Sequence, residues 1–238
     1  MPFHFKKFSV EQNRTAMKVG TDGVLLGAWT SLENNPQTIL DIGAGTGLIA
    51  LMLAQRSDAF QIDAVEVEEN AYQQCVENFE NSPWNDRLFC FHASLQKLAA
   101  DPERDLYDLI VSNPPFFQPN PKFSSPEEER TIARQYETLP FEELLESVRN
   151  LLAENGIFCV IIPFESEEKF IVLAQTYDLF PSKITRVKGS LETPVKRSLL
   201  QFSFEKKEIA QSELIIETSR QQYTEEYKKL VCDFYLKM

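Results

Sequence analysis

One segment combines an apolar run with groups that could act on an amino nitrogen: Asp108-Leu109-Ile110-Val111-Ser112-Asn113-Pro114-Pro115-Phe116. The lone pair of an aryl or amide NH₂ is delocalised, so this nitrogen is a poor nucleophile until acceptors hold its two protons. The Asn113 side-chain oxygen and the Pro114 carbonyl could be these acceptors, because the two prolines stiffen the loop and remove N–H donors. Phe116 offers an apolar face on which a base could stack. The motif favours group transfer to an amino nitrogen by positioning and fixed dipoles, although a proline turn after a strand is the simpler alternative.

A glycine-rich turn, Asp41-Ile42-Gly43-Ala44-Gly45-Thr46-Gly47, stands earlier in the chain. Glycines let a backbone approach a ligand closely and adopt positive φ. The spacing is not that of dinucleotide folds, and no Lys-Ser or Lys-Thr pair follows as in phosphate loops. Asp41 would repel a pyrophosphate but favour a cation, and Glu66 is placed to accept hydrogen bonds from a ribose diol. The turn therefore indicates a cationic nucleoside, against the alternative of a plain strand-to-helix turn.

Both motifs need a parallel sheet that brings strand ends together. From residue 38 onward, short apolar runs alternate with helical periods, which is typical of parallel strands joined by crossover helices. We expect strands at 38–42, 61–66, 87–91, 107–112 and 157–162, and helices at 23–32, 48–55, 70–79, 141–152 and 166–175. Asn155-Gly156 is expected to follow the end of the fourth of these helices.

The C-terminal part shows weaker patterns. Runs at 184–187 and 195–204 predict two antiparallel strands at the sheet edge, followed by a short apolar run at 214–217 and a helix at 224–235. The 238 residues are enough to bury a core without disulfides or metals. The four cysteines are scattered without a C-x-x-C pair, so we expect a reducing compartment and no metal site. No leader-like or membrane-spanning run is present, which favours a cytoplasmic protein.

Charge is unevenly distributed. The net charge of −12 opposes nucleic-acid binding at first sight. However, residues 1–30 and 181–207 are net basic, and these two segments could form one patch on an acidic body. Ordinary solvated faces are the alternative.

The glycine turn with Ile39-Leu40 before it, together with Val65-Glu66-Val67, resembles the cofactor half of class I S-adenosylmethionine methyltransferases. The resemblance implies an α/β, doubly wound, Rossmann-like fold with a mostly parallel seven-stranded sheet. It also implies S-adenosyl-L-methionine as cofactor, with Asp41, Gly43, Gly45 and Gly47 at its methionine portion and Glu66 at its ribose. Members often carry an acid that contacts the cofactor adenine, and Ser94 stands at that place here. With Asn-Pro-Pro-Phe, the chain resembles the amino-group methyltransferases.

The opening of the chain narrows the resemblance. Phe5-Lys6-Lys7-Phe8-Ser9-Val10 and the block from Ala16 to Trp29 resemble the bacterial valine-tRNA adenine-N6 methyltransferases, and looser matches continue to the tail. This implies methyl transfer to an anticodon-loop adenine in tRNA that is taken out of its stack. Residues 1–34 would form an extension that closes over the cofactor, with Thr21 and Asp22 as further contacts, and 35–238 the methyltransferase domain. Asp22 is also expected to cap the following helix.

The resemblance also directs the search for an RNA surface. We expect it around the basic side chains of the two net basic segments and in the loop 117–135, which is long enough to act as a lid and contains Phe123, Arg130 and Arg134. The candidate RNA-binding residues are Lys6, Lys7, Lys183, Arg186, Lys188, Lys196 and Arg197. We expect a monomer.

Three other functions stay open from the residues alone. A protein glutamine N5-methyltransferase would suit the acidic body, but that group usually has tyrosine at the place of Phe116. A guanine-N2 RNA methyltransferase would share the chemistry. A non-catalytic module that keeps the fold to bind RNA or a partner is the third.

Overall fold

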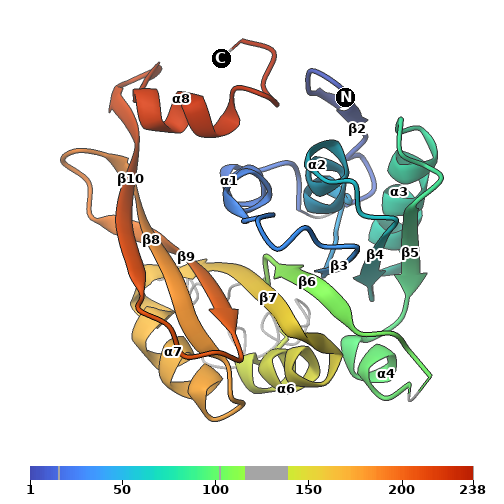
Figure 1. Ribbon diagram of the computed structural model, residues 1–238. Helices are drawn as coiled ribbons and strands as arrows, with labels where there is room; N and C mark the ends of the chain where they lie inside the picture. The colour runs from blue at the N-terminus through green and yellow to red at the C-terminus, as the bar shows by residue number, and fades with distance from the viewer. Residues whose placement is uncertain (16, 102, 116–138, 238) are drawn as a thin grey trace, which may run out of the picture.

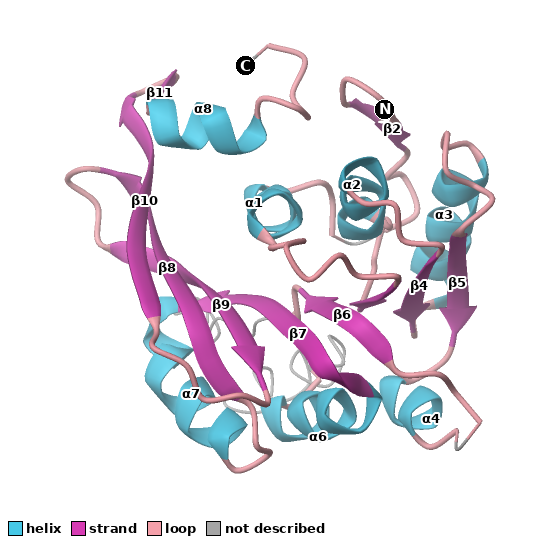
Figure 2. Ribbon diagram, viewed as in Figure 1, coloured by secondary structure: helices cyan, strands magenta, loops and turns pink. Residues whose placement is uncertain are grey.

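A nine-stranded sheet forms the centre of the computed structural model, which describes residues 1–238 except 16, 102, 116–138 and 238. In this described part the strand order is β11-β10-β8-β9-β7-β6-β3-β4-β5. Figures 1 and 2 show helices packed on both faces of the sheet. The predicted doubly wound α/β architecture is confirmed.

Five parallel strands make the half of the sheet that carries both motifs. They are β3 (Thr38–Ile42), β4 (Gln61–Glu66), β5 (Leu88–His92), β6 (Tyr107–Ser112) and β7 (Leu152–Pro163). β3 lies between β4 and β6, and β6 pairs with β7. Because helices cover both faces, these strands are mostly apolar runs rather than alternating ones, although the edge strand β5 leaves Phe89 exposed. That pattern explains why four of the five were predicted to within one residue.

The helices divide the core into two layers (Figure 1). α1 (Thr21–Trp29), α2 (Leu48–Arg56) and α3 (Glu69–Glu80) lie on one face. α4 (Leu95–Ala99), α6 (Phe141–Leu151) and α7 (Glu167–Gln175) lie on the other. α3 and α4 lie on opposite faces of the sheet. From β3 the chain adds β4 and β5 on one side and then β6 and β7 on the other, so the β3–β6 pair is the switch point of the sheet. Ligands of open α/β sheets bind outside such a switch point.

The start of β7 differs from the prediction. α6 ends at Leu151 and β7 begins at Leu152, so Asn155-Gly156 lies inside the strand and not at the helix end. The pairing with β6 jumps from Tyr107–Leu152 to Leu109–Ile157, which shows that β7 bulges there. A bulge accepts a glycine as readily as a helix C-terminus does, so the dipeptide alone could not separate them.

The sheet extends beyond the seven predicted strands. β8 (Phe180–Ser190) and β9 (Val195–Ser203) are antiparallel to one another, as predicted, and β9 is antiparallel to β7. They are not the edge, because β10 (Ala210–Ser219) pairs in parallel with β8 and β11 (Gln222–Tyr223) pairs with β10. Leu214 is the one buried side chain of β10, so its sequence shows little strand pattern.

The two ends of the chain pack together (Figure 1). β1 (Phe3–His4) and β2 (Ser9–Val10) form a hairpin, and α8 (Glu225–Val231) is shorter than the predicted helix. The Lys6 backbone N–H donates to the Phe234 carbonyl at 2.8 Å, and Phe5 pairs with Tyr235. The N-terminal hairpin therefore joins the core layer that contains α1 and α2.

Candidate functional site

The predicted motifs meet at the carboxyl edge of the parallel strands. The glycine turn follows β3, Glu66 ends β4, Ser94 follows β5 and Asn113 follows β6. Ile42 and Ser112 are register partners, and the Ser112 hydroxyl donates to the Ile42 carbonyl at 3.0 Å. Gly43 and Asn113 therefore leave the sheet from adjacent strands at the switch point, where the two motifs can act on one ligand pair.

The glycines of the turn have two different roles. Gly43, Gly45 and Gly47 have φ of 70°, 56° and 78°, a region that favours glycine. A Cβ at Gly43 or Gly45 would meet nothing within 4 Å, whereas one at Gly47 would lie 2.5 Å from Phe79 and 2.9 Å from Cys75. Gly47 is thus needed for packing α2 on α3, and the open space over Gly43 and Gly45 leaves room for a ligand.

Asp41 is a buried carboxylate that lacks one partner. Its Oδ2 accepts the Ala50 N–H at 3.1 Å, while its Oδ1 is buried with no hydrogen-bond partner. The pKa of Asp41 is raised to about 7, mainly by burial, with a smaller increase from the charge of Glu66 and a decrease from the Ala50 hydrogen bond. An orphaned carboxylate oxygen is costly in a folded protein unless a donor reaches it. The arrangement fits a cationic ligand, and the contact of Asp41 with the cofactor stays a prediction.

Glu66 holds the turn closed from the neighbouring strand. Its Oε2 accepts the Gly45 N–H at 2.8 Å, and its Oε1 accepts the N–H groups of Val67 and Glu68 at 2.8 and 3.0 Å. These bonds orient the carboxylate toward the glycine turn, where it can also accept from a diol.

Asn113 is half-buried and Pro114 is buried, whereas Pro115 is exposed. Within the described part of the chain, the Asn113 side chain has no hydrogen-bond partner. Its amide oxygen is therefore available to a substrate amino group. Phe116 and the expected lid, 117–135, lie outside the described residues.

The start of α1 departs from the prediction. Gly20 occupies the N-cap position and no side chain caps the helix, so the expectation that Asp22 caps it is wrong. Asp22 instead lies in the first turn, and its carboxylate accepts a hydrogen bond from Arg197 Nε at 2.8 Å. This ion pair ties α1 to the start of β9. Thr21 is the first residue of the helix and is exposed. Their proposed contacts with the cofactor stay predictions.

Ser94 caps α4, with its hydroxyl accepting the Lys97 N–H at 3.3 Å. That bond explains the serine structurally, and a contact with the cofactor adenine stays a prediction. His92 also has structural partners: Nε2 lies 3.0 Å from the Val67 carbonyl, Nδ1 lies 3.1 Å from Glu69, and the ring stacks on Tyr72.

The basic residues of the 181–207 segment do not form one surface. Side chains alternate between the two faces of a strand. Lys183 lies over the Trp29 ring of α1 at 4.4 Å, whereas Arg186 pairs with Glu167 of α7 at 2.6 Å on the opposite face. Lys188 pairs with Glu213 at 3.0 Å. Half-burial also lowers the pKa of Lys183. These partners neutralise much of the positive charge that the sequence suggested, while Lys196 is exposed.

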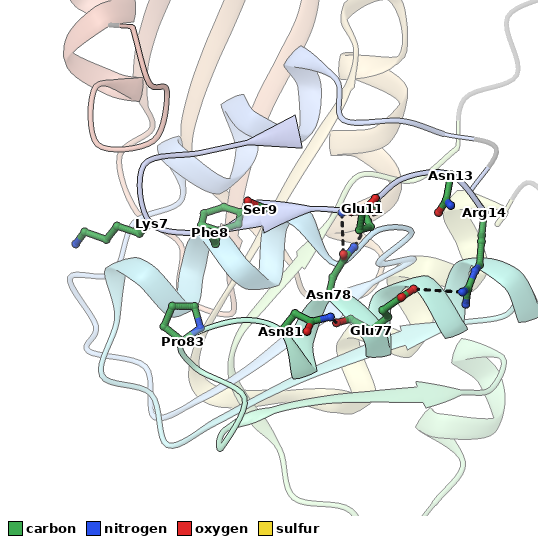
Figure 3. A pocket seen from close by; sticks show the side chains of 10 residues that line it. All are labelled: Lys7, Phe8, Ser9, Glu11, Asn13, Arg14, Glu77, Asn78, Asn81 and Pro83. Carbon is green, nitrogen blue, oxygen red and sulfur yellow. Dashed lines mark hydrogen bonds and ion pairs between the residues drawn. The ribbon is translucent and has the colours of Figure 1, made fainter. Parts of the chain in front are cut away.

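A surface groove of about 710 Å³ separates the N-terminal hairpin from α3 (Figure 3). Lys7, Arg14 and Glu77 are among its lining residues, and Arg14 lies 3.5 Å from Glu77. Lys7 points outward in Figure 3, away from this ion pair. The Lys6 amine donates to the Cys232 carbonyl. The glycine turn and Asn113 do not line this groove, although its lining residue Asn78 also contacts the turn.

Asn78 is a residue of the site that sequence reasoning missed. It is 2% exposed; its Nδ2 donates to the carbonyls of Glu11 and Thr46 at 2.9 and 2.8 Å, and its Oδ1 accepts the Glu11 N–H at 2.8 Å. One side chain thus joins the N-terminal segment, α3 and the glycine turn. An asparagine inside a predicted amphipathic helix gives no signal of this role, because its partners are distant in sequence.

The described residues offer neither a membrane-spanning helix nor a metal-binding cluster. None of their helices is both long and apolar enough to cross a membrane. They also hold no group of three or more His, Cys, Asp or Glu side chains placed to bind a metal ion.

Comparison with known proteins was consistent with this geometry. Residues 22–176 match the family model described as methyltransferase small domain. A tRNA1(Val) (adenine(37)-N6)-methyltransferase of Flavobacterium psychrophilum is 60% identical over 99% of this chain and 100% of the relative. Proteins of the same name from Flavobacterium johnsoniae and Bacteroides fragilis are 59% and 45% identical, over 99% of this chain and 100% and 98% of theirs.

Solved structures agree on the fold. A predicted O-methyltransferase from Agrobacterium tumefaciens superposes with a TM-score of 0.68 at 16% identity, covering 90% of this chain and 96% of that one. A ribosomal protein L11 methylase from Lactobacillus delbrueckii subsp. bulgaricus has a TM-score of 0.55 at 15% identity, with 84% and 98% covered. At these identities the likeness shows a methyltransferase-type α/β fold alone.

Proposed function

This chain belongs to the methyltransferase small domain family and to the tRNA1(Val) (adenine(37)-N6)-methyltransferases within it, and on that premise we propose that it methylates N6 of adenine 37 in valine tRNA. The observation that carries the proposal is the meeting of the Asp41–Gly47 turn and Asn113-Pro114 on adjacent strands at the switch point. A donor site and an acceptor site are thereby held side by side.

The residues fit S-adenosylmethionine as the methyl donor. Asp41 has an orphaned oxygen for a cationic portion, Gly43 and Gly45 leave open space, and Glu66 is oriented to accept from a ribose diol. The bound cofactor supplies an electrophilic methyl group. Asp41, the glycine turn and Glu66 would hold it, while Thr21, Asp22 and Ser94 are the further contacts that we propose.

The chain's own contribution to the reaction is to orient the acceptor. The Asn113 amide oxygen and the Pro114 carbonyl accept hydrogen bonds from the two N6 protons, which turns the nitrogen lone pair toward the methyl group. The nitrogen would form its bond to the methyl carbon as the carbon–sulfur bond of the sulfonium breaks, leaving a neutral thioether, and its excess proton would then pass to water. Because the two acceptors are held by a strand end and a proline pair, they need little reorganisation during the reaction.

The acceptor must be a base outside its helix, since the N6 group of a stacked and paired adenine cannot reach the end of β6. A loop nucleotide satisfies this condition at low cost. Because tRNA is the acceptor, we also propose a cytoplasmic location.

Methyl transfer from labelled S-adenosylmethionine to tRNA lacking its native modifications tests the proposal directly. We expect label in N6-methyladenosine after nucleoside digestion, and mapping to position 37 of valine tRNA. Label in N2-methylguanosine would assign the guanine chemistry instead. Label in a glutamine-containing protein and none in RNA would contradict the proposed acceptor, and cofactor binding without any transfer would indicate a binding module.

A further inference from the structure

An exposed phenylalanine stands at the same edge of the sheet as Asn113. β7 ends at Pro163, and Phe164 begins η1 (Phe164–Ser166) directly afterwards. Phe158 to Ile162 are 0% exposed, whereas Phe164 is 39% exposed. A Pro-Phe pair thus stands at the end of β7, just as the Asn-Pro-Pro-Phe motif stands after β6. A single exposed phenylalanine is common on protein surfaces, so its surroundings must decide its role.

The Phe164 ring is held in place by side chains of neighbouring elements. The guanidinium of Arg186 lies over the Phe164 ring, 5.7 Å from its centroid. Arg186 is held in turn by Glu167, with Nη2 at 2.6 Å from Oε1 and Nε at 3.1 Å. Glu167 is 6% exposed and also accepts a hydrogen bond from the buried Ser198 hydroxyl. The aromatic ring thus rests on an arginine that a buried carboxylate orients.

Part of the Arg186 guanidinium stays available to a ligand. Within the described residues, the Nη1 of Arg186 has no partner, because its ion pair with Glu167 uses Nε and Nη2. The Arg186 side chain is 39% exposed. An aromatic face beside an available guanidinium edge is the combination that binds unpaired nucleotides, the ring by stacking on a base and the cation by contact with phosphate.

The strand register places Phe164 and Arg186 beyond the position of the target base. Ser112 is aligned with Val160, so Phe164 lies three residues further along the strand direction than Asn113. At about 3.3 Å per residue, that is an offset of roughly 10 Å along the strand, one strand to the side. A base whose amino group is held by Asn113 would not reach so far, but a nucleotide next to it in the RNA would.

We propose that Phe164 and Arg186 form the binding site for a nucleotide flanking the methylated adenine. The inference rests on the proposed function, because it needs an RNA acceptor. The ring of Phe164 stacks on the flanking base, and Arg186 contacts a phosphate beside it. This contact would hold the anticodon loop open while the adenine enters the site.

Steady-state kinetics on unmodified tRNA, with three substitutions at one position, test the inference. Phe164→Ala should raise KM for tRNA by about 5- to 100-fold, the range expected for loss of one stacked base, with kcat nearly unchanged. Phe164→Leu keeps the apolar volume without an aromatic face and should resemble the alanine variant. Phe164→Trp restores a face and should retain the wild-type KM. If Phe164 had only a structural role, the leucine variant should keep a KM closer to the wild type than the tryptophan variant does.

Phe60→Ala is the matched control, because Phe60 is 63% exposed and precedes β4 at the opposite edge of the sheet. It should keep the wild-type KM. If the wild type labels tRNA and Phe164→Ala keeps its KM, the inference is overturned and the proposed function stands. If the wild type labels no tRNA, the proposed function fails and the inference fails with it. Equal KM increases in the Phe60 and Phe164 variants would also overturn the inference.

Discussion

At the scale of single residues, Asn113 should determine turnover and not cofactor affinity. Asn113→Leu keeps a similar volume but removes the oxygen that accepts from the substrate amino group. We expect kcat to fall by about 100- to 1000-fold, as when one preorganised polar group is removed from an active site. Cofactor affinity, measured by calorimetry, should stay close to the wild type.

Asn113→Asp is the informative partner of that variant. It keeps an acceptor oxygen at the same position, so it should recover part of the activity that leucine loses. Loss of cofactor binding in the leucine variant would contradict the proposed role, since Asn113 would then support the glycine turn rather than the acceptor.

Asp41 should make stability fall as pH rises. Burial raises its pKa from 3.8 to about 7, with a smaller contribution from Glu66. Between these two values the unfolded chain gives up a proton that the folded protein retains, so the free energy of unfolding decreases with increasing pH, by an amount on the order of 4 kcal/mol in total. Above about pH 7 both states are ionised and the loss is complete.

The prediction can be tested by urea unfolding of the cofactor-free protein at about pH 5 and about pH 8. Asp41→Asn removes the titrating group, so this variant should be more stable relative to the wild type at the higher pH than at the lower. S-adenosylmethionine should also bind the wild type more tightly above about pH 7, where the carboxylate is charged. An equal pH dependence in both proteins would refute the shifted pKa.

Residues at the ends of strands could be placed from the sequence, whereas residues whose partners are distant along the chain could not. Asp41 is the last residue but one of β3 and Glu66 is the last of the neighbouring parallel strand β4, so their shared edge could be predicted from the apolar runs around them. The pair between Asp22 and Arg197 joins positions 175 residues apart. Only the packing of α1 against the start of β9 brings them together, which no local pattern encodes.

At the scale of elements, Asn78 should couple the N-terminal segment to the glycine turn. Asn78→Ala leaves the N–H and carbonyl of Glu11 and the carbonyl of Thr46 without their partner. Unpaired buried groups of this kind cost about 1–3 kcal/mol each, less where water can enter. We expect the free energy of unfolding to fall by about 2 kcal/mol or more, and cofactor affinity to fall as well.

Asn81→Ala provides a control at the end of the same helix. Its side chain donates to the Glu77 carbonyl at an exposed position, so it should change stability by only about 0.5 kcal/mol and leave cofactor affinity unchanged. If both variants lose the same stability, or if the Asn78 variant binds cofactor normally, the coupling is wrong.

Element boundaries show where sequence patterns lose power. Strands covered on both faces were predicted closely because burial makes them continuously apolar. The five-residue α4 and the largely exposed β10 escaped prediction, because a short helix and an exposed strand carry few apolar positions. Asn155-Gly156 illustrates a different difficulty. A helix end and a strand bulge both tolerate these residues, so the dipeptide alone does not distinguish them.

At the scale of the whole molecule, the structure changes the meaning of the charge distribution. The net charge is −12, and many cations of the 181–207 segment are held by acidic or aromatic partners on two different faces. A sum of charges along the sequence could not show this, because alternation along β8 and β9 separates neighbours in sequence. Lys7 in the N-terminal hairpin is exposed and has no such partner among the described residues, so it should contribute more to RNA binding than a paired lysine such as Lys188.

The salt dependence of tRNA affinity tests this distinction. Each cation that neutralises a phosphate contributes roughly 0.7–0.9 to the slope of log affinity against log salt concentration. Lys7→Gln should therefore reduce the slope by nearly one, measured by anisotropy between about 50 and 200 mM salt. The double variant Lys188→Gln/Glu213→Gln removes an ion pair without changing the net charge, and its slope should equal that of the wild type. The opposite result, a smaller slope in the double variant and an unchanged slope in Lys7→Gln, would contradict this distinction. It would mean that Lys188 leaves Glu213 to neutralise a phosphate in the complex, and that the RNA lies over β8 and β10 rather than over the N-terminal hairpin.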